Sequence, residues 1–174
     1  LLAEGGDRAW LDALERTLAQ RAVAIAAARL DLARRLDRAA GATGQQAEEG
    51  PFPVPRIAVT GDAEQWLAES PALAVEDRLA EAWRRNRRHD AESGQTSLGP
   101  HRSDMTVVYA GRGLPAAQCS TGEQKALLIG LILASARLTA AERGAQPLVL
   151  LDEIAAHLDP DRRAALYRHL LDSG

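Results

Sequence analysis

Two adjacent carboxylates, Asp152 and Glu153, follow an apolar run at 148–151. A run that is apolar along its length is typical of a buried parallel strand, and α/β proteins bind ligands beyond the carboxyl ends of such strands. Nucleotide hydrolysis needs one carboxylate to hold Mg²⁺ and a second group to orient or deprotonate the attacking water. Because the chain turns where a strand ends, we expect Asp152 to bind the metal and Glu153 to act as the catalytic base. The alternative is a strand that ends in acids at a loop.

A second segment, Ser120-Thr121-Gly122-Glu123, precedes a long apolar stretch. A turn of small residues at a helix N-terminus lets a phosphate approach the backbone N–H groups. The same Ser-x-x-Glu spacing describes a capping box, in which Ser120 and Glu123 bond to each other's backbone N–H groups. Phosphate binding and helix capping need the same backbone geometry. The segment therefore predicts the start of a helix, which either binds a phosphate or is only capped.

A third segment, Leu158-Asp159-Pro160, follows the two acids. Asp at the N-cap with Pro at the first helical position predicts a helix that begins near Pro160. The functional interpretation adds a contact of Asp159 with a partner subunit across a nucleotide. The order of the three segments is a compound pattern: a small-residue turn, a helix of about 20 residues, a Leu-rich strand that ends in Asp-Glu, and a second helix start.

Residues 119–159 resemble the signature, Walker B and D-loop segments of an ABC-type ATPase head. Cys119-Ser120-Thr121-Gly122-Glu123 stands where that superfamily has Leu-Ser-Gly-Gly-Gln. With the preceding Gly-Pro-His-Arg-Ser-Asp at 99–104, the stretch 93–171 resembles the RecF family of bacterial DNA replication and repair proteins. Residues 1–92 are similar, more loosely, to the helical second lobe of that family.

This resemblance implies a function, cofactors and partners. ATP and Mg²⁺ are the implied cofactors, with the segment 120–123 and Asp159 on the nucleotide, Asp152 on the metal and Glu153 as the catalytic residue. ATP would join two heads into a homodimer in which the signature of one faces the phosphate loop of the other. The dimer would bind DNA at gaps or single-/double-strand junctions and, with RecR and RecO, help to load RecA. Hydrolysis would open the dimer.

The sequence contains no phosphate loop of the form GxxxxGK(S/T). Lys125 is the only lysine, and Ala126 and Leu127 follow it. The chain also begins with Leu1 rather than methionine. We therefore expect a piece of a longer protein, and we expect this piece alone not to hydrolyse ATP.

Composition limits the possible partners. The 174 residues carry a net charge of −3, so the chain as a whole does not attract nucleic acid. A DNA contact would need a local patch, and the basic run Arg84, Arg85, Arg87 and Arg88 is the candidate; a solvated helix face offset by nearby acids is the alternative. The single cysteine, Cys119, excludes a disulfide framework and favours a cytoplasmic location. The hydropathy pattern predicts no signal peptide and no membrane span.

These patterns predict an α/β protein with two parts. Residues 1–92 are expected to form a mainly helical lobe, and residues 93–174 the C-terminal half of an ABC-type ATPase head with layered sheet and helices. Strands are predicted at 56–60, 105–109 and 148–152. Helices are predicted at 7–38, 62–69, 71–91 and 121–142 and from 160 onward, with a Pro-rich loop at 39–55.

The helix at 7–38 carries an apolar stripe with a seven-residue repeat, which predicts its buried face. We expect one arm of a helical hairpin; a coiled coil between chains is the alternative. The stripe consists of Leu11, Leu18, Ile25 and Leu32, widened by Leu14, Ala22, Ala28 and Leu36.

Two other functional classes compete with the RecF-like interpretation. Another ABC-type machine, such as an SMC-like ATPase or a transporter subunit, would share the head motifs. A long coiled-coil insertion would favour the former, and a membrane partner the latter. The second class is a non-catalytic module that binds DNA or a partner protein, and a phosphate loop upstream in the same gene would exclude it.

Overall fold

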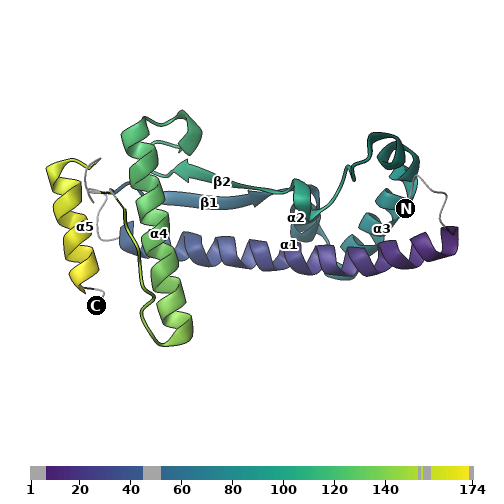
Figure 1. Ribbon diagram of the computed structural model, residues 1–174, viewed down its shortest axis with the longest axis horizontal. Helices are drawn as coiled ribbons and strands as arrows, with labels where there is room; N and C mark the ends of the chain where they lie inside the picture. The colour runs from purple at the N-terminus through teal and green to yellow at the C-terminus, as the bar shows by residue number, and fades with distance from the viewer. Residues whose placement is uncertain (1–6, 45–51, 153, 155–157, 173–174) are drawn as a thin grey trace. The chain divides into compact units, whose positions relative to one another are not determined.

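The computed structural model describes residues 7–44, 52–152, 154 and 158–172 (Figure 1). Five α-helices dominate it: α1 (Arg8–Gly44), α2 (Asp62–Glu69), α3 (Ala72–Ser93), α4 (Thr121–Arg143) and α5 (Pro160–Asp172). Three strands, β1 (Pro55–Thr60), β2 (Asp104–Tyr109) and β3 (Leu114–Pro115), form a sheet of order β1-β2-β3. Short 3₁₀ turns, η1 (Pro100–Arg102) and η2 (Ala116–Gln118), precede β2 and α4. The fold is a mostly helical α/β arrangement, and four of the five predicted helices and two of the three predicted strands are confirmed to within two residues at the predicted boundaries.

The described chain divides into two compact units. The first comprises α1 up to Leu32 together with Val59–Met105, and the second comprises Ala33–Ala58 and the chain from Thr106 onward. Helix α1 and strands β1 and β2 contribute residues to both. The predicted boundary near residue 92, between a helical lobe and half of an ATPase head, stays a prediction.

The core of the first unit corrects the predicted face of α1. Leu11, the first residue of the predicted stripe, is buried at 8% exposed. Leu18, Ile25 and Leu32 are 46–49% exposed, whereas small residues one position away from the stripe are buried. These are Ala19, Val23 and Ala26, with Ala22 from the predicted set. A strict seven-residue repeat drifts by about 20° per heptad around a straight helix, so it does not stay on one buried face.

The larger side chains of this core come from α3. Val75, Leu79 and Trp83, spaced four residues apart, pack against the alanine-rich face of α1. The indole N–H of Trp83 donates a hydrogen bond to the carbonyl of Leu98 at 2.9 Å. Small residues on one helix and large ones on the other fill the shared space, because interiors are packed to nearly constant density. Leu18 and Ile25 instead line an open, mainly apolar groove of about 560 Å³ in the same unit.

Helix α1 is longer than predicted. The expected loop from residue 39 is wrong for 39–44, which continue the helix to Gly44. Ala39 and Ala40 are strong helix formers, and Ala40 is buried, at 4% exposed. Propensity and burial together therefore extend the helix. The predicted loop positions 45–51 lie outside the described residues.

The second unit corrects the predicted strand at 148–152. Ile129 and Leu133 of α4 pack with Leu158 and with Leu166 of α5. The segment 148–152 runs past this core without strand structure, and Leu148 and Leu150 are 87% and 83% exposed. A parallel strand needs hydrogen-bonding strands beside it, and in the described part of the chain the sheet consists of β1, β2 and β3 alone.

Helix α4 has the length and hydropathy of a possible membrane span. It contains 23 residues, and the mean hydropathy of its most apolar 18-residue window is 1.3. Core helices of soluble proteins meet the same test. Ala126, Ile129 and Leu133 of this helix are buried, and 28% of the window is buried.

Candidate nucleotide-binding site at the start of helix α4

Ser120 begins α4 as its N-cap. Its Oγ accepts a hydrogen bond from the backbone N–H of Glu123 at 3.4 Å. Glu123 Oε2 accepts in return from the backbone N–H of Ser120, at 2.9 Å, and from its hydroxyl, at 2.8 Å. These reciprocal bonds form the predicted capping box, which is confirmed.

The turn leaves the helix start open to a ligand. Ser120, Thr121 and Gly122 are exposed, and a Cβ built on Gly122 would meet nothing within 4 Å. The first N–H groups of a helix have no partner within the helix, and the helix dipole is positive there. The start of α4 therefore has space for a phosphate, and the helix dipole favours an anion there. A phosphate contact by the four residues 120–123 stays a prediction.

Arg112 reaches this turn from the hairpin that joins β2 and β3. The backbone N–H groups of Arg112 and Gly113 donate to the carbonyl of Tyr109, at 3.2 and 2.8 Å. Gly113 has a φ of 63°, a left-handed conformation that favours glycine. The Arg112 guanidinium lies 5.8 Å from the centre of the Tyr109 ring, and its Nη1 lies 2.7 Å from Glu123 Oε1. The sequence patterns did not indicate this pair.

The local field keeps Glu123 ionised. Its pKa is lowered, first by the hydrogen bond from the Ser120 backbone N–H and then by the Ser120 hydroxyl. The positive charges of Arg112 and Arg162 lower the pKa further. Arg162 belongs to the first turn of α5, so the starts of α4 and α5 lie within electrostatic reach of each other.

Asp159 caps α5 as predicted. Its Oδ1 accepts a hydrogen bond from the backbone N–H of Arg162 at 2.8 Å, and its Oδ2 lies 3.4 Å from Arg162 Nε. Asp159 is exposed. Its role as a helix cap is confirmed, and its contact with a nucleotide or a partner subunit stays a prediction.

The predicted metal ligand, Asp152, is also exposed. Among the described residues, no group of three or more His, Cys, Asp or Glu side chains lies close enough together to hold a metal ion. Mg²⁺ in nucleotide sites is commonly held by one or two carboxylates together with phosphate oxygens and water. A single accessible carboxylate fits that donor set. Glu153, the predicted catalytic residue, lies outside the described residues.

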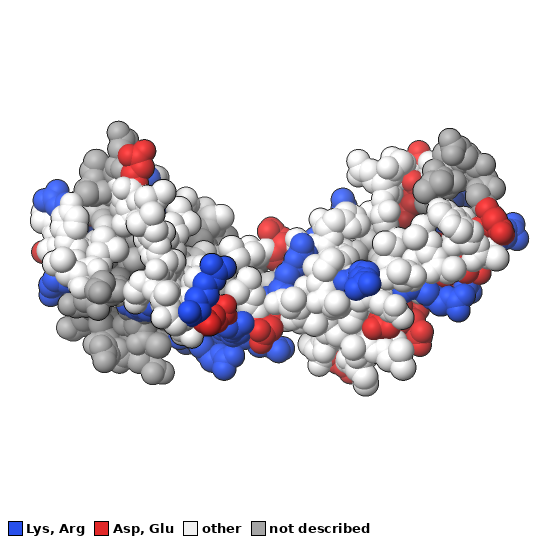
Figure 2. All heavy atoms as spheres, turned by 60° about the horizontal axis from the view of Figure 1, so that its bottom comes forward, with Lys and Arg blue, Asp and Glu red and all other residues white. Residues whose placement is uncertain are grey.

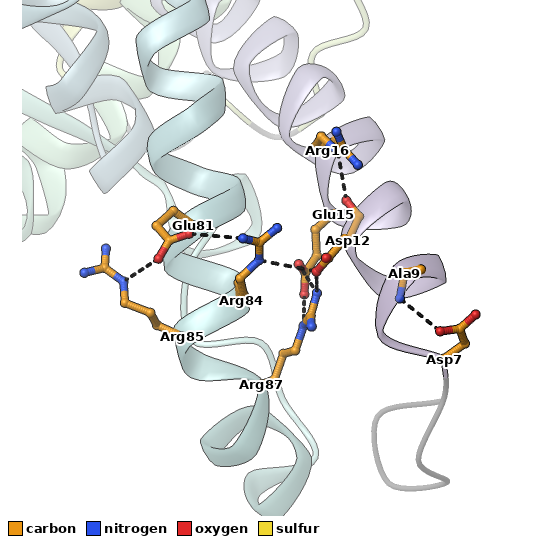
Figure 3. A network of polar contacts seen from close by, with 9 residues as sticks. All are labelled: Asp7, Ala9, Asp12, Glu15, Arg16, Glu81, Arg84, Arg85 and Arg87. Carbon is orange, nitrogen blue, oxygen red and sulfur yellow. Dashed lines mark hydrogen bonds and ion pairs between the residues drawn. The ribbon is translucent and has the colours of Figure 1, made fainter.

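The predicted DNA-binding arginines take part in ion pairs with acids, as Figure 3 shows for Arg84, Arg85 and Arg87. Arg87 Nε and Nη2 lie 2.7 and 2.6 Å from the two carboxylate oxygens of Glu15, on α1. Arg84 pairs with Asp12 at 3.3 Å, and Arg85 with Glu81 at 3.7 Å.

Exposure separates these arginines. The Arg87 side chain is only 19% exposed, whereas those of Arg85 and Arg88 are 68% and 92% exposed. Its hydrogen bonds to Glu15 raise the pKa of Arg87 above its already high value, and the pKa of Asp12 is lowered, chiefly by its bond to Arg87. Arg87 therefore joins α3 to α1. Basic side chains are interspersed with acidic ones on the face in Figure 2.

Comparison with known proteins identifies the family. Residues 19–173 match the family described as "AAA domain, putative AbiEii toxin, Type IV TA system". The chain belongs to this AAA-domain family. It is also a homologue of RecF. It is 47% identical over 168 residues to the DNA replication and repair protein RecF of Mesorhizobium japonicum, and this match covers 96% of this chain and 44% of that protein. The RecF of Brucella abortus is 47% identical over 175 residues, and this match covers 100% of this chain and 45% of that protein.

A solved structure shows the same fold. The chain matches a structure described as the recombination mediator protein RecF-ATP in the RecFOR pathway, with a TM-score of 0.74 and 19% identity. The match covers 97% of this chain and 44% of that one. The chain thus has the fold of part of RecF and spans about 44% of the length of these RecF proteins.

Proposed function

We propose that this chain is the C-terminal part of a RecF-like ATPase and supplies half of a nucleotide site shared between two subunits. The observation that carries the proposal is the capped, exposed start of α4, in a chain that is homologous to RecF throughout its length. The longer polypeptide, with a phosphate loop, is called the intact protein below.

The residues divide the chemistry as follows. Residues 120–123 bind the phosphate of ATP held on the phosphate loop of the other subunit, through the first N–H groups of α4. Asp152 holds Mg²⁺, which supplies charge neutralisation when it is bound. Glu153 orients the attacking water and takes its proton. Asp159, at the start of α5, contacts the partner subunit across the nucleotide.

The proposed biological role is ATP-dependent DNA binding inside the cell. The ATP-bound homodimer recognises gaps or single-/double-strand junctions and acts with RecO and RecR to load RecA. The names of the relatives, which specify DNA replication and repair and the RecFOR pathway, support this role. Arg85 and Arg88 are the best placed of the four basic residues for a phosphate contact, because their side chains are the most exposed.

Glu153→Gln in the intact protein tests the proposal. The amide keeps the size of the side chain but cannot accept a proton, so we expect ATP-driven dimerisation to persist while hydrolysis falls by at least about 100-fold. Asp152→Asn should instead weaken the response to Mg²⁺. This chain alone should release no phosphate from ATP, with or without DNA. Unchanged hydrolysis by Glu153→Gln would assign the catalytic role to another residue, and turnover by this chain alone would contradict the shared site.

A further inference from the structure

The start of α4 carries a negative charge where the proposed function requires a phosphate to bind. The Glu123 carboxylate lies 2.8 Å from the Ser120 hydroxyl, and its lowered pKa keeps it ionised. Like charges at such short range repel each other. A phosphate that approaches Ser120 therefore needs this carboxylate to be neutralised.

Arg112 places a positive charge next to the Glu123 carboxylate. Its Nη1 lies 2.7 Å from Glu123 Oε1, on the oxygen that the capping box leaves free. The hairpin bonds to the Tyr109 carbonyl and the left-handed Gly113 fix the turn that carries it. The Arg112 side chain is 58% exposed, whereas that of Glu123 is only 15% exposed, so the ion pair joins an exposed cation to a largely covered carboxylate.

We propose that Arg112 is a positioning residue for the turn Ser120–Glu123 at the start of α4. It holds and neutralises Glu123, so that the Ser120 hydroxyl and the first N–H groups of α4 can receive the phosphate of a nucleotide bound to the other subunit. This inference rests on the proposed function. Arg112 acts through Glu123 rather than on the phosphate, because its guanidinium already pairs with the Glu123 carboxylate and lies 5.8 Å from the centre of the Tyr109 ring.

A double-mutant cycle in the intact protein separates the two modes of action. The variants are Arg112→Gln, Glu123→Gln and their combination, and the readout is the ATP concentration that gives half-maximal dimerisation. We expect Arg112→Gln to raise this concentration at least about fivefold, a typical size for a coupling effect. Glu123→Gln is the reference for the combination, because Gln also completes a capping box but carries no charge. The combination should match Glu123→Gln, because the repulsive charge is then gone.

Three controls make the cycle decisive. Arg112→Lys should restore dimerisation, because it keeps the charge. Arg143→Gln removes a charge from the last turn of the same helix and should change nothing. ATP binding by the monomer should be equal in all variants, because the phosphate loop belongs to its own subunit.

The outcomes distinguish failure of the inference on Arg112 from failure of the proposed function. If the combined variant is as defective as Arg112→Gln, Arg112 acts on the phosphate or on folding, and the inference is wrong. Normal dimerisation of Arg112→Gln would also overturn it. Ser120→Arg in the same assay tests the proposed function separately: if Ser120→Arg dimerises normally, the signature assignment itself fails. If Ser120→Arg is defective and Arg112→Gln is normal, only the inference on Arg112 fails.

Discussion

Glu123 Oε2 accepts hydrogen bonds from both the backbone N–H and the hydroxyl of Ser120, at 2.9 and 2.8 Å. The Ser120 hydroxyl has one proton to donate, and the cap uses it. If Ser120 donates that proton to a phosphate, the hydroxyl must turn away from Glu123. Helix capping and phosphate binding therefore compete for one hydrogen at this residue, and the backbone bond to Glu123 can persist in both states.

The capping box should stabilise the chain in a pH-dependent way. A carboxylate whose pKa is lowered on folding contributes stability above its unfolded pKa, near 4.5 for Glu123, and loses it as the pH falls through the folded value. We expect the wild-type chain to unfold at a higher temperature than Glu123→Gln at pH 7, and this difference to shrink as the pH falls below about 4.5. Circular dichroism melts of both proteins at several pH values provide the measurement. A difference that stays constant with pH would contradict the role given to the Glu123 charge.

Gly122 and Gly130, both on α4, provide a test position and a control position for the proposed phosphate site. A Cβ on Gly122 meets nothing within 4 Å, and one on Gly130 makes an ordinary contact with the Pro53 carbonyl oxygen at 3.6 Å. Alanine should therefore be tolerated at both, and should stabilise the helix interior at Gly130 by about 0.5–1 kcal/mol. In the intact protein, Gly122→Ala should weaken ATP-driven dimerisation, because the methyl group occupies the phosphate approach, whereas Gly130→Ala should not. Equal dimerisation by the two variants would remove Gly122 from the site.

Arg87 and Arg88 should separate folding from DNA binding. Arg87→Ala leaves Glu15, whose side chain is 11% exposed, without its main partner and should cost about 1–3 kcal/mol in urea unfolding. Arg88→Ala should change stability by less than about 0.5 kcal/mol, because the side chain is 92% exposed. If Arg88 contacts DNA, its loss should lower the slope of log affinity against log salt by about one in the intact protein. An unchanged slope would exclude that contact.

The sequence predicted local features of the site better than distant ones. The capping box at Ser120 depends on residues three positions apart, and the helix start at Asp159 on the adjacent Asp159-Pro160 pair, so local sequence predicts both. The strand at 148–152 depends on neighbouring strands that the spacing cannot supply, and it was wrong. The Arg112–Glu123 pair joins a hairpin turn to a helix 11 residues later, a separation with no helical or strand period. It could be found only in three dimensions.

The predicted apolar stripe of α1 is wrong beyond Leu11 for a related reason. Leu11 is buried as predicted, but farther along the helix the core formed one position away from the seven-residue repeat, on the alanines that pack with α3. Hydrophobicity identified the helix, and side-chain volume decided which face was buried. A pattern of apolar and polar positions treats large and small apolar residues alike, so it could not predict which face of α1 is buried.

The central claim is that Ser120 serves nucleotide held by the other subunit. Ser120→Arg should fold and bind ATP on its own phosphate loop but should not hydrolyse it. A variant of the intact protein with its phosphate-loop lysine replaced should also be inactive. Mixing the two creates heterodimers in which one shared site has both halves intact. The most direct measurement is phosphate release by this mixture: we predict turnover in the mixture where each variant alone has none. Wild-type turnover by Ser120→Arg alone would contradict the claim.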